Sequence, residues 1–339
     1  MRNASREAGF QGAYFSGSTI GMPDVAELPR ASDVDVVLVI ADAEPPMKLG
    51  KFIYHDALLE VTYLSSNQLA SAEDVLASIH LAGSFRTDTI IADPTGRLRT
   101  LQQQVSRHFA EPGWVRRRCE KACQGVEAWI RAIDSTATWH EQVTVWLFGN
   151  SMTSLVPILA ALRNPTVRKR YLAARDVLTD YHHTDVYDQL LTMLGCIDMT
   201  PARADEHVDA LSRTFDAADA VARTPYRFRS DISAAARPIA IDGSRELIQA
   251  GNHREAVFWI VATFARCHTI LALDAPELQR AHAPAFDAVV ADLGIHSSDD
   301  LRSRGEAVIK FLPRLWETAE DIMSVRASLA GGVRPQAGP

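Results

Sequence analysis

Two carboxylates stand at the start of a β-branched run, where Asp33 and Asp35 lead into the apolar segment 36–40. In a β-strand, residues i and i+2 point to the same face, so these side chains would project side by side near a sheet edge. Two like charges held together are costly unless a cation neutralises them. Hard oxygen ligands favour Mg²⁺ or Mn²⁺ over zinc, so the pair predicts a divalent metal site.

A third acid, Glu60, lies inside the apolar run 58–64. If the two runs form adjacent strands, Glu60 would lie beside the aspartate pair. Three carboxylates from two strands could hold two metal ions about 3.5–4 Å apart, an arrangement that serves in-line phosphoryl or nucleotidyl transfer. The simpler alternative is that each aspartate is an ordinary turn residue at the start of a strand.

The order of these residues resembles a known family. Gly17-Ser18, then Asp33-x-Asp35 opening a hydrophobic strand, then a later acid within an apolar strand, is similar to the signature of the DNA polymerase β nucleotidyltransferase superfamily. The motif-bearing resemblance covers residues 10–110. Within the superfamily, a small first domain followed by a large helical remainder looks most like the antibiotic nucleotidyltransferases of the kanamycin and lincosamide type.

The resemblance implies a Mg²⁺-dependent enzyme that transfers a nucleoside monophosphate from a nucleoside triphosphate to a hydroxyl group and releases pyrophosphate. Gly17 would let the backbone approach the triphosphate, and the Ser18 hydroxyl would bind its terminal phosphates. Asp33 and Asp35 would bridge two Mg²⁺ ions, and Glu60 would complete the shell of the second ion. The acceptor would be a hydroxylated small molecule, aminoglycoside-like or a biosynthetic intermediate.

Cations should converge on the leaving pyrophosphate because it carries several negative charges. The densest basic segment is 168–170, which we expect to open a helix after Asn164-Pro165, and Lys169 is the phosphate ligand that we expect there. A solvated basic face is the alternative for this segment. Lys48 and Lys51, between the two acidic runs, are a second candidate pair.

Other polar clusters carry less information. The arginine run 116–118 is expected to be a solvated helix start. The adjacent His182 and His183 would point different ways on a helix, which favours a surface or loop role over a metal site. No general base is assigned. The helical-region candidates for that role are Glu141, Glu255, His182, His183 and Asp185.

Length and charge narrow the class of protein. A chain of 339 residues is long enough for two domains. Its 35 Lys+Arg against 42 Asp+Glu give a net charge of −7, which argues against a general nucleic-acid binder and suits a cationic small-molecule acceptor. The cysteines show no zinc-site spacing, so we expect reduced thiols. They are Cys119, Cys123, Cys196 and Cys267.

No membrane attachment is expected. The N-terminus lacks a basic-then-apolar signal pattern, so a cytoplasmic location is expected. The most hydrophobic long stretch, 257–273, contains Arg266 and His268, which favours a buried helix over a membrane span. The sequence leaves the oligomeric state open, and a homodimer is possible.

The acidic residues require a small sheet to position them, and the first part of the chain predicts one. Its strands and helices alternate. Strands are expected at 33–40, 58–64 and 89–92, and helices at 72–82 and 98–109. The break at Glu111-Pro112-Gly113 predicts a domain boundary. We therefore expect a nucleotidyltransferase catalytic domain at 1–110 with a small mixed sheet.

The remainder predicts a helical bundle, so the fold class is α+β. Apolar residues recur at three- and four-residue spacing in about eight segments after Trp114. These segments are 126–130, 143–147, 155–162, 171–178, 186–194, 208–221, 254–273 and 307–325. We expect a helical substrate-binding domain at 111–330 and a disordered tail at 331–339.

Three functional classes remain open. The first is a nucleotidyltransferase acting on a small-molecule hydroxyl. The second is a nucleotidyltransferase that modifies a protein hydroxyl or an RNA end, which a basic groove in the folded protein would favour. The third is a non-catalytic protein whose acids are structural, which would bind no nucleotide in a metal-dependent way.

Overall fold

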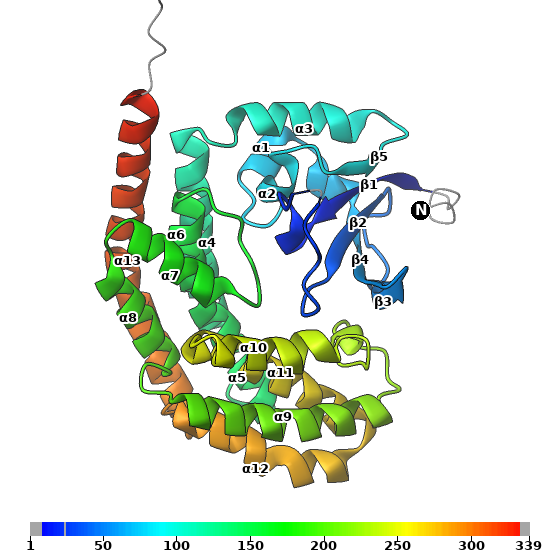
Figure 1. Cartoon of the computed structure of the whole chain (residues 1–339), viewed down its shortest axis with the longest axis vertical. Helices are drawn as coiled ribbons and strands as arrows, with labels where there is room; N and C mark the ends of the chain where they lie inside the picture. The colour runs from blue at the N-terminus through cyan, green and yellow to red at the C-terminus, as the bar shows by residue number, and fades with distance from the viewer. Residues whose placement is uncertain (1–8, 24, 333–339) are drawn as a thin grey trace, which may run out of the picture.

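The structure is a computed structural model that describes residues 9–23 and 25–332. It is α+β, with a five-stranded mixed sheet near the N-terminus and helices through most of the remainder (Figure 1). The strands are β1 (Phe10–Ser16), β2 (Val34–Ile40), β3 (Gly50–Tyr54), β4 (Ala57–Ser65) and β5 (Ile90–Ala92). Their order across the sheet is β3-β4-β2-β1-β5, which makes β2 and β4 inner strands.

The sheet register sets four polar residues in one row. β2 and β4 are parallel, with Asp35 opposite Glu60. β3 runs antiparallel to β4 with Lys51 opposite Glu60, and β1 runs antiparallel to β2 with Ser16 opposite Asp35. Directly opposed residues project to the same face of a sheet, so a local strand pattern places these side chains together.

Strand β3 is absent from the sequence prediction. It forms a hairpin with β4 through His55 and Asp56, which both have positive φ angles of 46° and 64°. Such two-residue turns usually carry Asn-Gly or Asp-Gly, so the His-Asp pair hides the hairpin from sequence reasoning.

Short helices cover the sheet. They are η2 (Gly17–Thr19), η3 (Ser66–Leu69), α1 (Ala72–Leu76), α2 (Ala82–Phe85) and α3 (Arg97–His108). The expected single helix at 72–82 is wrong, because the chain leaves α1 at Ala77. The Ser78 hydroxyl accepts the backbone N–H groups of His80 and Leu81, and such local bonds compete with a continuous helix.

The second part of the chain is helical. Its α-helices are α4 (Pro112–Arg131), α5 (Trp139–Ser151), α6 (Leu155–Ala160), α7 (Arg170–Asp180), α8 (Thr184–Leu194), α9 (Pro201–Val221), α10 (Gly243–Gln249), α11 (His253–Asp274), α12 (Pro276–Asp292) and α13 (Ser298–Gly332). Shorter segments are η4 (Met152–Ser154), η5 (Arg229–Asp231) and the π-helical η6 (Pro238–Asp242). Helices α10 and α12 were not predicted.

Two corrections concern helix ends. Helix α7 begins at Arg170 with Lys169 at its N-cap, so the expected start directly after Asn164-Pro165 is wrong. Helix α13 continues through residues 331–332, which were expected to belong to the tail. The rest of that predicted tail, 333–339, lies outside the described residues.

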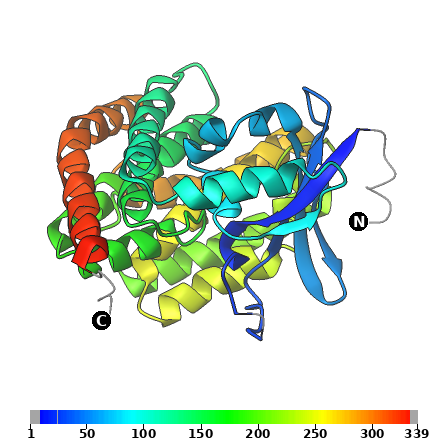
Figure 2. The same cartoon turned by 90° about the horizontal axis from the view of Figure 1, so that it is seen from above.

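The core of the helical region is built around α11, whose buried side chains include Phe258, Phe264 and Leu271. Helix α13 lies on the side of the molecule away from the sheet in both views (Figure 2). Two stretches, Trp139–Ala160 and His253–Asp274, have the length and hydropathy of a membrane span. They are 78% and 83% buried within the protein, which is typical of core helices.

The helical region is tied to the sheet region by polar contacts. The loop between α6 and α7 makes three hydrogen bonds to the sheet region. From the sheet region, Arg86 Nη1 donates to the Leu162 carbonyl (3.1 Å). From the loop, Asn164 Nδ2 donates to the Gly17 carbonyl (2.7 Å) and Arg168 Nη2 donates to the Ala31 carbonyl (2.6 Å).

Arg118 makes a further tie, and its expected role as a solvated helix-start residue is wrong. It is only 1% exposed, because it lies on the face of α4 that also buries Val115 and Cys119. Its guanidinium donates to the carbonyls of Leu76 (2.9 Å) and Phe109 (2.7 Å). A buried guanidinium with two carbonyl partners fixes the start of α4 against the sheet region.

Candidate metal and nucleotide site

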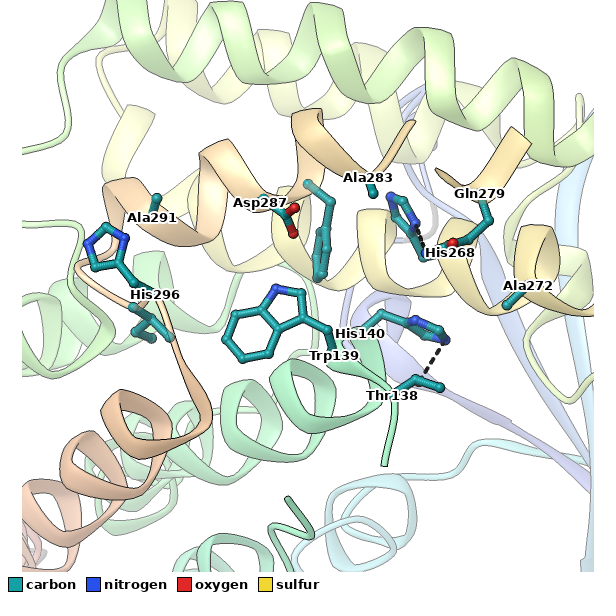
Figure 3. Close-up of a pocket in the computed structure, with 12 residues that line it drawn as sticks. Thr138, Trp139, His140, His268, Ala272, Gln279, Ala283, Asp287, Ala291 and His296 are labelled. Atoms are coloured by element: carbon teal, nitrogen blue, oxygen red, sulfur yellow. Dashed lines mark hydrogen bonds between the residues drawn. The ribbon is translucent and has the colours of Figure 1, made fainter. Parts of the chain in front are cut away.

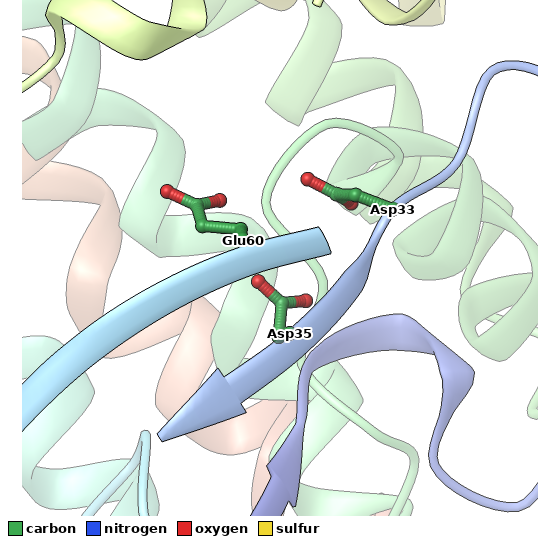
Figure 4. A group of neighbouring side chains, drawn as sticks. All are labelled: Asp33, Asp35 and Glu60. Carbon is green, nitrogen blue, oxygen red and sulfur yellow. The ribbon is translucent and has the colours of Figure 1, made fainter. Parts of the chain in front are cut away.

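Three carboxylates meet at the ends of two neighbouring strands (Figure 4). Asp33 directly precedes β2, Asp35 lies on β2, and Glu60 lies opposite Asp35 on β4. One oxygen of each carboxylate lies within 4.8 Å of the others. The structure therefore brings together the three acids that the strand pattern singled out.

The turn that follows β1 lies directly on Asp35. Gly17 has a φ of +76°, a backbone conformation that favours glycine. A Cβ atom at this position would overlap the Asp35 carboxylate. Ser18 is exposed, and it lines the same cleft as the three acids. Glycine is thus required both for the turn and for its close approach to Asp35.

The acids open into a cleft of about 630 Å³ between the sheet region and the helices. Clefts of this size commonly hold small-molecule ligands. The turn at Gly17 and Ser18 forms one side, and helix α7 with Trp259 of α11 contributes to the other. Both parts of the chain are therefore needed to build the site.

Two lysines neutralise part of the acidic cluster. The Lys48 ammonium pairs with Glu60 Oε1, and the Lys51 ammonium pairs with both Glu60 Oε2 and Asp33 Oδ2. Their side chains are only 9% and 6% exposed. The sequence suggested these lysines as phosphate ligands, whereas in this structure their partners are carboxylates.

A fourth carboxylate reaches the lysines from the helical region. Asp231 in η5 lies 3.6 Å from the Lys48 ammonium and 3.5 Å from that of Lys51. Its other neighbour is the Arg266 guanidinium, at 3.4 Å. Sequence reasoning missed Asp231 because it lies in an irregular segment far along the chain from the strands that it contacts.

Close packing makes this long-range contact possible. Gly50 opens β3 with a φ of +81°, and a Cβ there would clash with the Ser230 side chain. The backbone of η5 can therefore lie against β3 and bring Asp231 to the lysines. Phe228 packs beneath this group, with its ring centroid 5.1 Å from the Lys48 ammonium and 4.6 Å from the Arg266 guanidinium.

The ionisation of the acids differs with their partners. Burial raises the pKa of Glu60, but the ammonium groups of Lys51 and Lys48 more than offset burial and hold this pKa at about 2. Burial by itself would lower the pKa of Lys51, but the charges of Glu60, Asp33 and Asp231 more than offset burial and raise this pKa. These two groups are therefore charged together at neutral pH.

Asp35 is left out of this ion-pair network. Burial first, and then the charges of Asp33 and Glu60, raise its pKa to about 7. Within residues 9–23 and 25–332, no hydrogen bond or ion pair is found for its carboxylate. A divalent cation held by the three carboxylates would supply the missing countercharge, so these residues fit a Mg²⁺ site.

Of the expected basic segment, Lys169 is the residue placed for a ligand. Arg168 is bonded to the Ala31 carbonyl, and buried Arg170 donates to the Ser151 hydroxyl (2.7 Å) and stacks on Phe258. Lys169 lines the cleft, and its ammonium group makes no hydrogen bond or ion pair within the described part of the chain. Burial and the charge of Arg168 lower its pKa.

The candidate general bases lie elsewhere. Glu141 closes the capping box of α5 by accepting from Thr138. Glu255 accepts from the Tyr187 hydroxyl (2.5 Å) and from Arg175 (2.7 Å). Neither these two glutamates nor His182, His183 and Asp185 line the cleft. The helical-region carboxylates that do line it are Asp176 and Asp231, which sequence reasoning did not select.

A second cavity, of about 590 Å³, lies between the start of α5 and helices α11 and α12 (Figure 3). His140 contacts the Thr138 hydroxyl (3.2 Å), and His268 contacts the Gln279 amide (3.4 Å). Burial lowers the pKa of both histidines, that of His268 to about 4. The lowered pKa values of His140 and His268 and the single lining carboxylate, Asp287, make this cavity a weaker candidate for polyanion or metal chemistry.

Comparisons with known proteins bring no relative. A scan against models of protein families and a search of curated proteins both found no match. The function is therefore inferred from the geometry of the cleft.

Proposed function

We propose that this protein is a Mg²⁺-dependent nucleotidyltransferase that transfers a nucleoside monophosphate from a nucleoside triphosphate to a hydroxyl of a small molecule, releasing pyrophosphate. The observation that carries the proposal is the Asp35 carboxylate between Asp33 and Glu60, which has no hydrogen bond or ion pair among the described residues and lies directly under the Gly17 turn in a cleft of about 630 Å³. A structural ion-pair network would not require this additional, uncompensated charge.

Asp33, Asp35 and Glu60 would hold the metal. When bound there, Mg²⁺ would neutralise these carboxylates, lower the pKa of the acceptor hydroxyl and polarise the phosphate undergoing attack. Asp35 supplies ligand oxygens that no described side chain competes for, whereas oxygens of Asp33 and Glu60 face ammonium groups.

The rest of the cleft suits a triphosphate. The Gly17 turn has no side chain, so a ligand can approach its backbone, and the exposed Ser18 hydroxyl can donate to a phosphate oxygen. The Lys169 ammonium, which forms no ion pair within the described residues, can bind the same group from the helical side. These contacts would orient the α-phosphorus toward the metal-holding carboxylates.

The acceptor would enter from the helical side. Phe228 and Trp259 line the cleft there, each with its ring against the Arg266 guanidinium, and Asp176 adds a carboxylate. The Asp176 carboxylate suits a cationic, hydroxylated acceptor. The net charge of −7 favours the approach of such a molecule.

The charge of the cleft does not favour a nucleic-acid substrate. Its charged lining residues are Lys48, Lys51, Arg168, Lys169 and Arg266, against Asp33, Asp35, Glu60, Asp176 and Asp231. The five positive groups are thus matched by five negative ones, while a surface that binds nucleic acid needs an excess of positive charge. The balance supports a small-molecule acceptor.

One observation favours the non-catalytic alternative. Lys48 and Lys51 already neutralise Glu60 and Asp33, so most of the acidic cluster is compensated without a metal. In that alternative the acids hold β2, β3 and β4 together, and nucleotide binding does not depend on metal.

Calorimetric titration of the four ribonucleoside triphosphates, each with Mg²⁺ and with EDTA, separates the two functions. We expect one or more to bind only with Mg²⁺, and Asp35→Asn to weaken that binding on the order of 100-fold because it removes a metal ligand. Asp198→Asn is the matched control, since Asp198 is exposed and does not line the cleft. Equal binding with EDTA or by Asp35→Asn would refute the proposal.

Asp35→Asn, which should weaken nucleotide binding, should at the same time stabilise the folded protein. The Asp35 pKa of about 7 lies above its unfolded value of 3.8, so ionisation costs stability increasingly as the pH rises from about 4 to about 7. Without metal at pH 8, Asp35→Asn should raise the free energy of unfolding by roughly 1–3 kcal/mol. Urea unfolding in EDTA measures this change and shows that lost binding is not lost folding.

A further inference from the structure

The two buried lysines pair with three of the carboxylate oxygens that a metal could use. Lys48 takes one oxygen of Glu60, and Lys51 takes the other together with Asp33 Oδ2. A metal ion and an ammonium group cannot share a carboxylate oxygen closely, because both are positively charged. Binding of a divalent ion by all three carboxylates therefore requires at least one ammonium group to move.

Asp231 offers the displaced lysines a place within the cleft. Its carboxylate lies 3.6 Å from the Lys48 ammonium and 3.5 Å from that of Lys51, with its two oxygens facing different lysines. The Phe228 ring lies 5.1 Å from the Lys48 ammonium, which favours a cation there. A modest change of side-chain rotamer would exchange Glu60 for Asp231 as the partner of either lysine.

Asp231 alone cannot compensate both lysines fully. It also faces Arg266 at 3.4 Å, so one carboxylate would then serve three cations. Arg266 is only 9% exposed, and both lysines are similarly buried, so water compensates them poorly. Additional negative charge in the cleft would remove this deficit, and a triphosphate carries it.

We propose that Lys48 and Lys51 are internal counter-ions, whose ammonium groups compete with a free divalent metal ion for the carboxylates. When the metal binds together with nucleotide, these ammonium groups pair with the triphosphate instead, and Asp231 keeps them within the cleft. This inference rests on the proposed function, since it takes the three carboxylates as metal ligands and the cleft as the triphosphate site. The protein would then bind free metal weakly and the metal–triphosphate complex tightly.

The lysine variants should change the affinity for free Mn²⁺ and the affinity for Mg²⁺–tripolyphosphate in opposite directions. Lys51→Met removes a competitor for Glu60 and Asp33, so affinity for free Mn²⁺ should rise on the order of tenfold. It also removes a partner of the polyphosphate, so affinity for Mg²⁺–tripolyphosphate should fall by a similar factor. Mn²⁺ electron paramagnetic resonance measures the first affinity and calorimetry the second, and inorganic tripolyphosphate makes the result independent of the nucleotide base.

Three further variants test the geometry. Lys48→Met should change both affinities in the same directions as Lys51→Met, but by less, because Lys48 contacts only Glu60 among the three acids. Asp231→Asn should weaken Mn²⁺ binding, since the lysines lose their alternative partner. Lys121→Met removes one positive charge from the exposed face of α4, outside the cleft, and should change neither affinity.

The outcomes separate the inference from the function that it assumes. If wild-type Mn²⁺ binding depends on Asp35 but Lys51→Met and Lys48→Met leave it unchanged or weaken it, the counter-ion role is wrong and the metal site stands. If neither probe binds wild type or any lysine variant, while thermal unfolding shows folded proteins, the metal site itself is wrong.

Discussion

At the residue scale, the site depends on the contact between Gly17 and Asp35. The positive φ of Gly17 turns the chain after β1, and its lack of a side chain leaves room for the Asp35 carboxylate. Asp35 in turn faces Glu60 across the parallel pair of β2 and β4. The turn and the acids therefore form one unit, although they are separated along the chain.

Gly17→Ala should impair both folding and metal binding. The positive φ costs an alanine about 1–2 kcal/mol, and overlap of its Cβ with the Asp35 carboxylate adds to that cost. Gly251→Ala is the matched control, since Gly251 has a φ of +79° but a Cβ added there would meet no atom within 4 Å. Urea unfolding and Mn²⁺ titration should show a larger stability loss at Gly17 and a loss of metal affinity there alone.

At the scale of elements, the loop between α6 and α7 joins the helical region to the Gly17 turn at the edge of the cleft. Three hydrogen bonds connect this loop to the sheet region, and that of Asn164 ends on the Gly17 carbonyl. Lys169 follows in the same loop, at the N-cap of α7. The loop thus positions both the turn that we propose binds phosphate and Lys169, which lines the same cleft.

Asn164→Ala should weaken triphosphate binding more than metal binding. Loss of the 2.7 Å bond to Gly17 frees the turn, but the acids remain held by β2 and β4. We expect a stability loss of about 1 kcal/mol and a clear fall in affinity for Mg²⁺–tripolyphosphate, with Mn²⁺ affinity unchanged. Arg86→Met removes a bond between the same loop and the sheet region without touching Gly17. Equal losses of triphosphate affinity in both variants would contradict this role of Asn164.

The elements also show where sequence reasoning succeeds. Strands β2 and β4 were predicted nearly to their ends because each is a long apolar run rich in strand-forming residues, and side-chain alternation is a local property. Strand β3 was missed because its pairing depends on the unusual His55-Asp56 turn. The missing strand hid the significance of Lys51, which becomes visible only when it lies opposite Glu60.

At the scale of the whole molecule, the helical region carries buried ionisable groups that do not line the cleft. His268 is fully buried on α11, and its Nε2 has no hydrogen-bond partner within the described residues. Burial lowers its pKa from 6.5 to about 4, with the charges of His140 and His282 adding to the effect. The folded protein therefore keeps this imidazole neutral at a pH where the unfolded chain protonates it.

Acid should destabilise the protein through this group. The pKa of His268 is lower in the folded protein than in the unfolded chain, so acid favours the unfolded chain. The stability associated with neutral His268 is therefore fully present above about pH 6.5 and is lost as the pH falls toward 4. Urea unfolding should show that His268→Gln reduces the loss between pH 7 and pH 5 by about 1–2 kcal/mol. Identical profiles for wild type and His268→Gln would exclude this origin.

The sequence by itself determined which acids of the sheet region face the cleft and how they are spaced. Asp33, Asp35 and Glu60 could be selected because strand alternation is set by neighbouring residues, and a helical remainder could be predicted for the same reason. The general bases considered from the helical region were misplaced, since a helix pattern does not reveal which face meets a distant sheet.

Only the tertiary structure decided the countercharges. Lys48 and Lys51 pair with carboxylates, and Asp231 completes their surroundings from a segment far along the chain. The Lys51–Glu60 pair depends on the pairing of β3 with β4, and the Asp231 contacts depend on the packing of η5 on β3. No local spacing encodes either arrangement. The choice between a metal centre and a structural ion-pair network thus depends on long-range contacts, because electrostatic energy depends on distances in space.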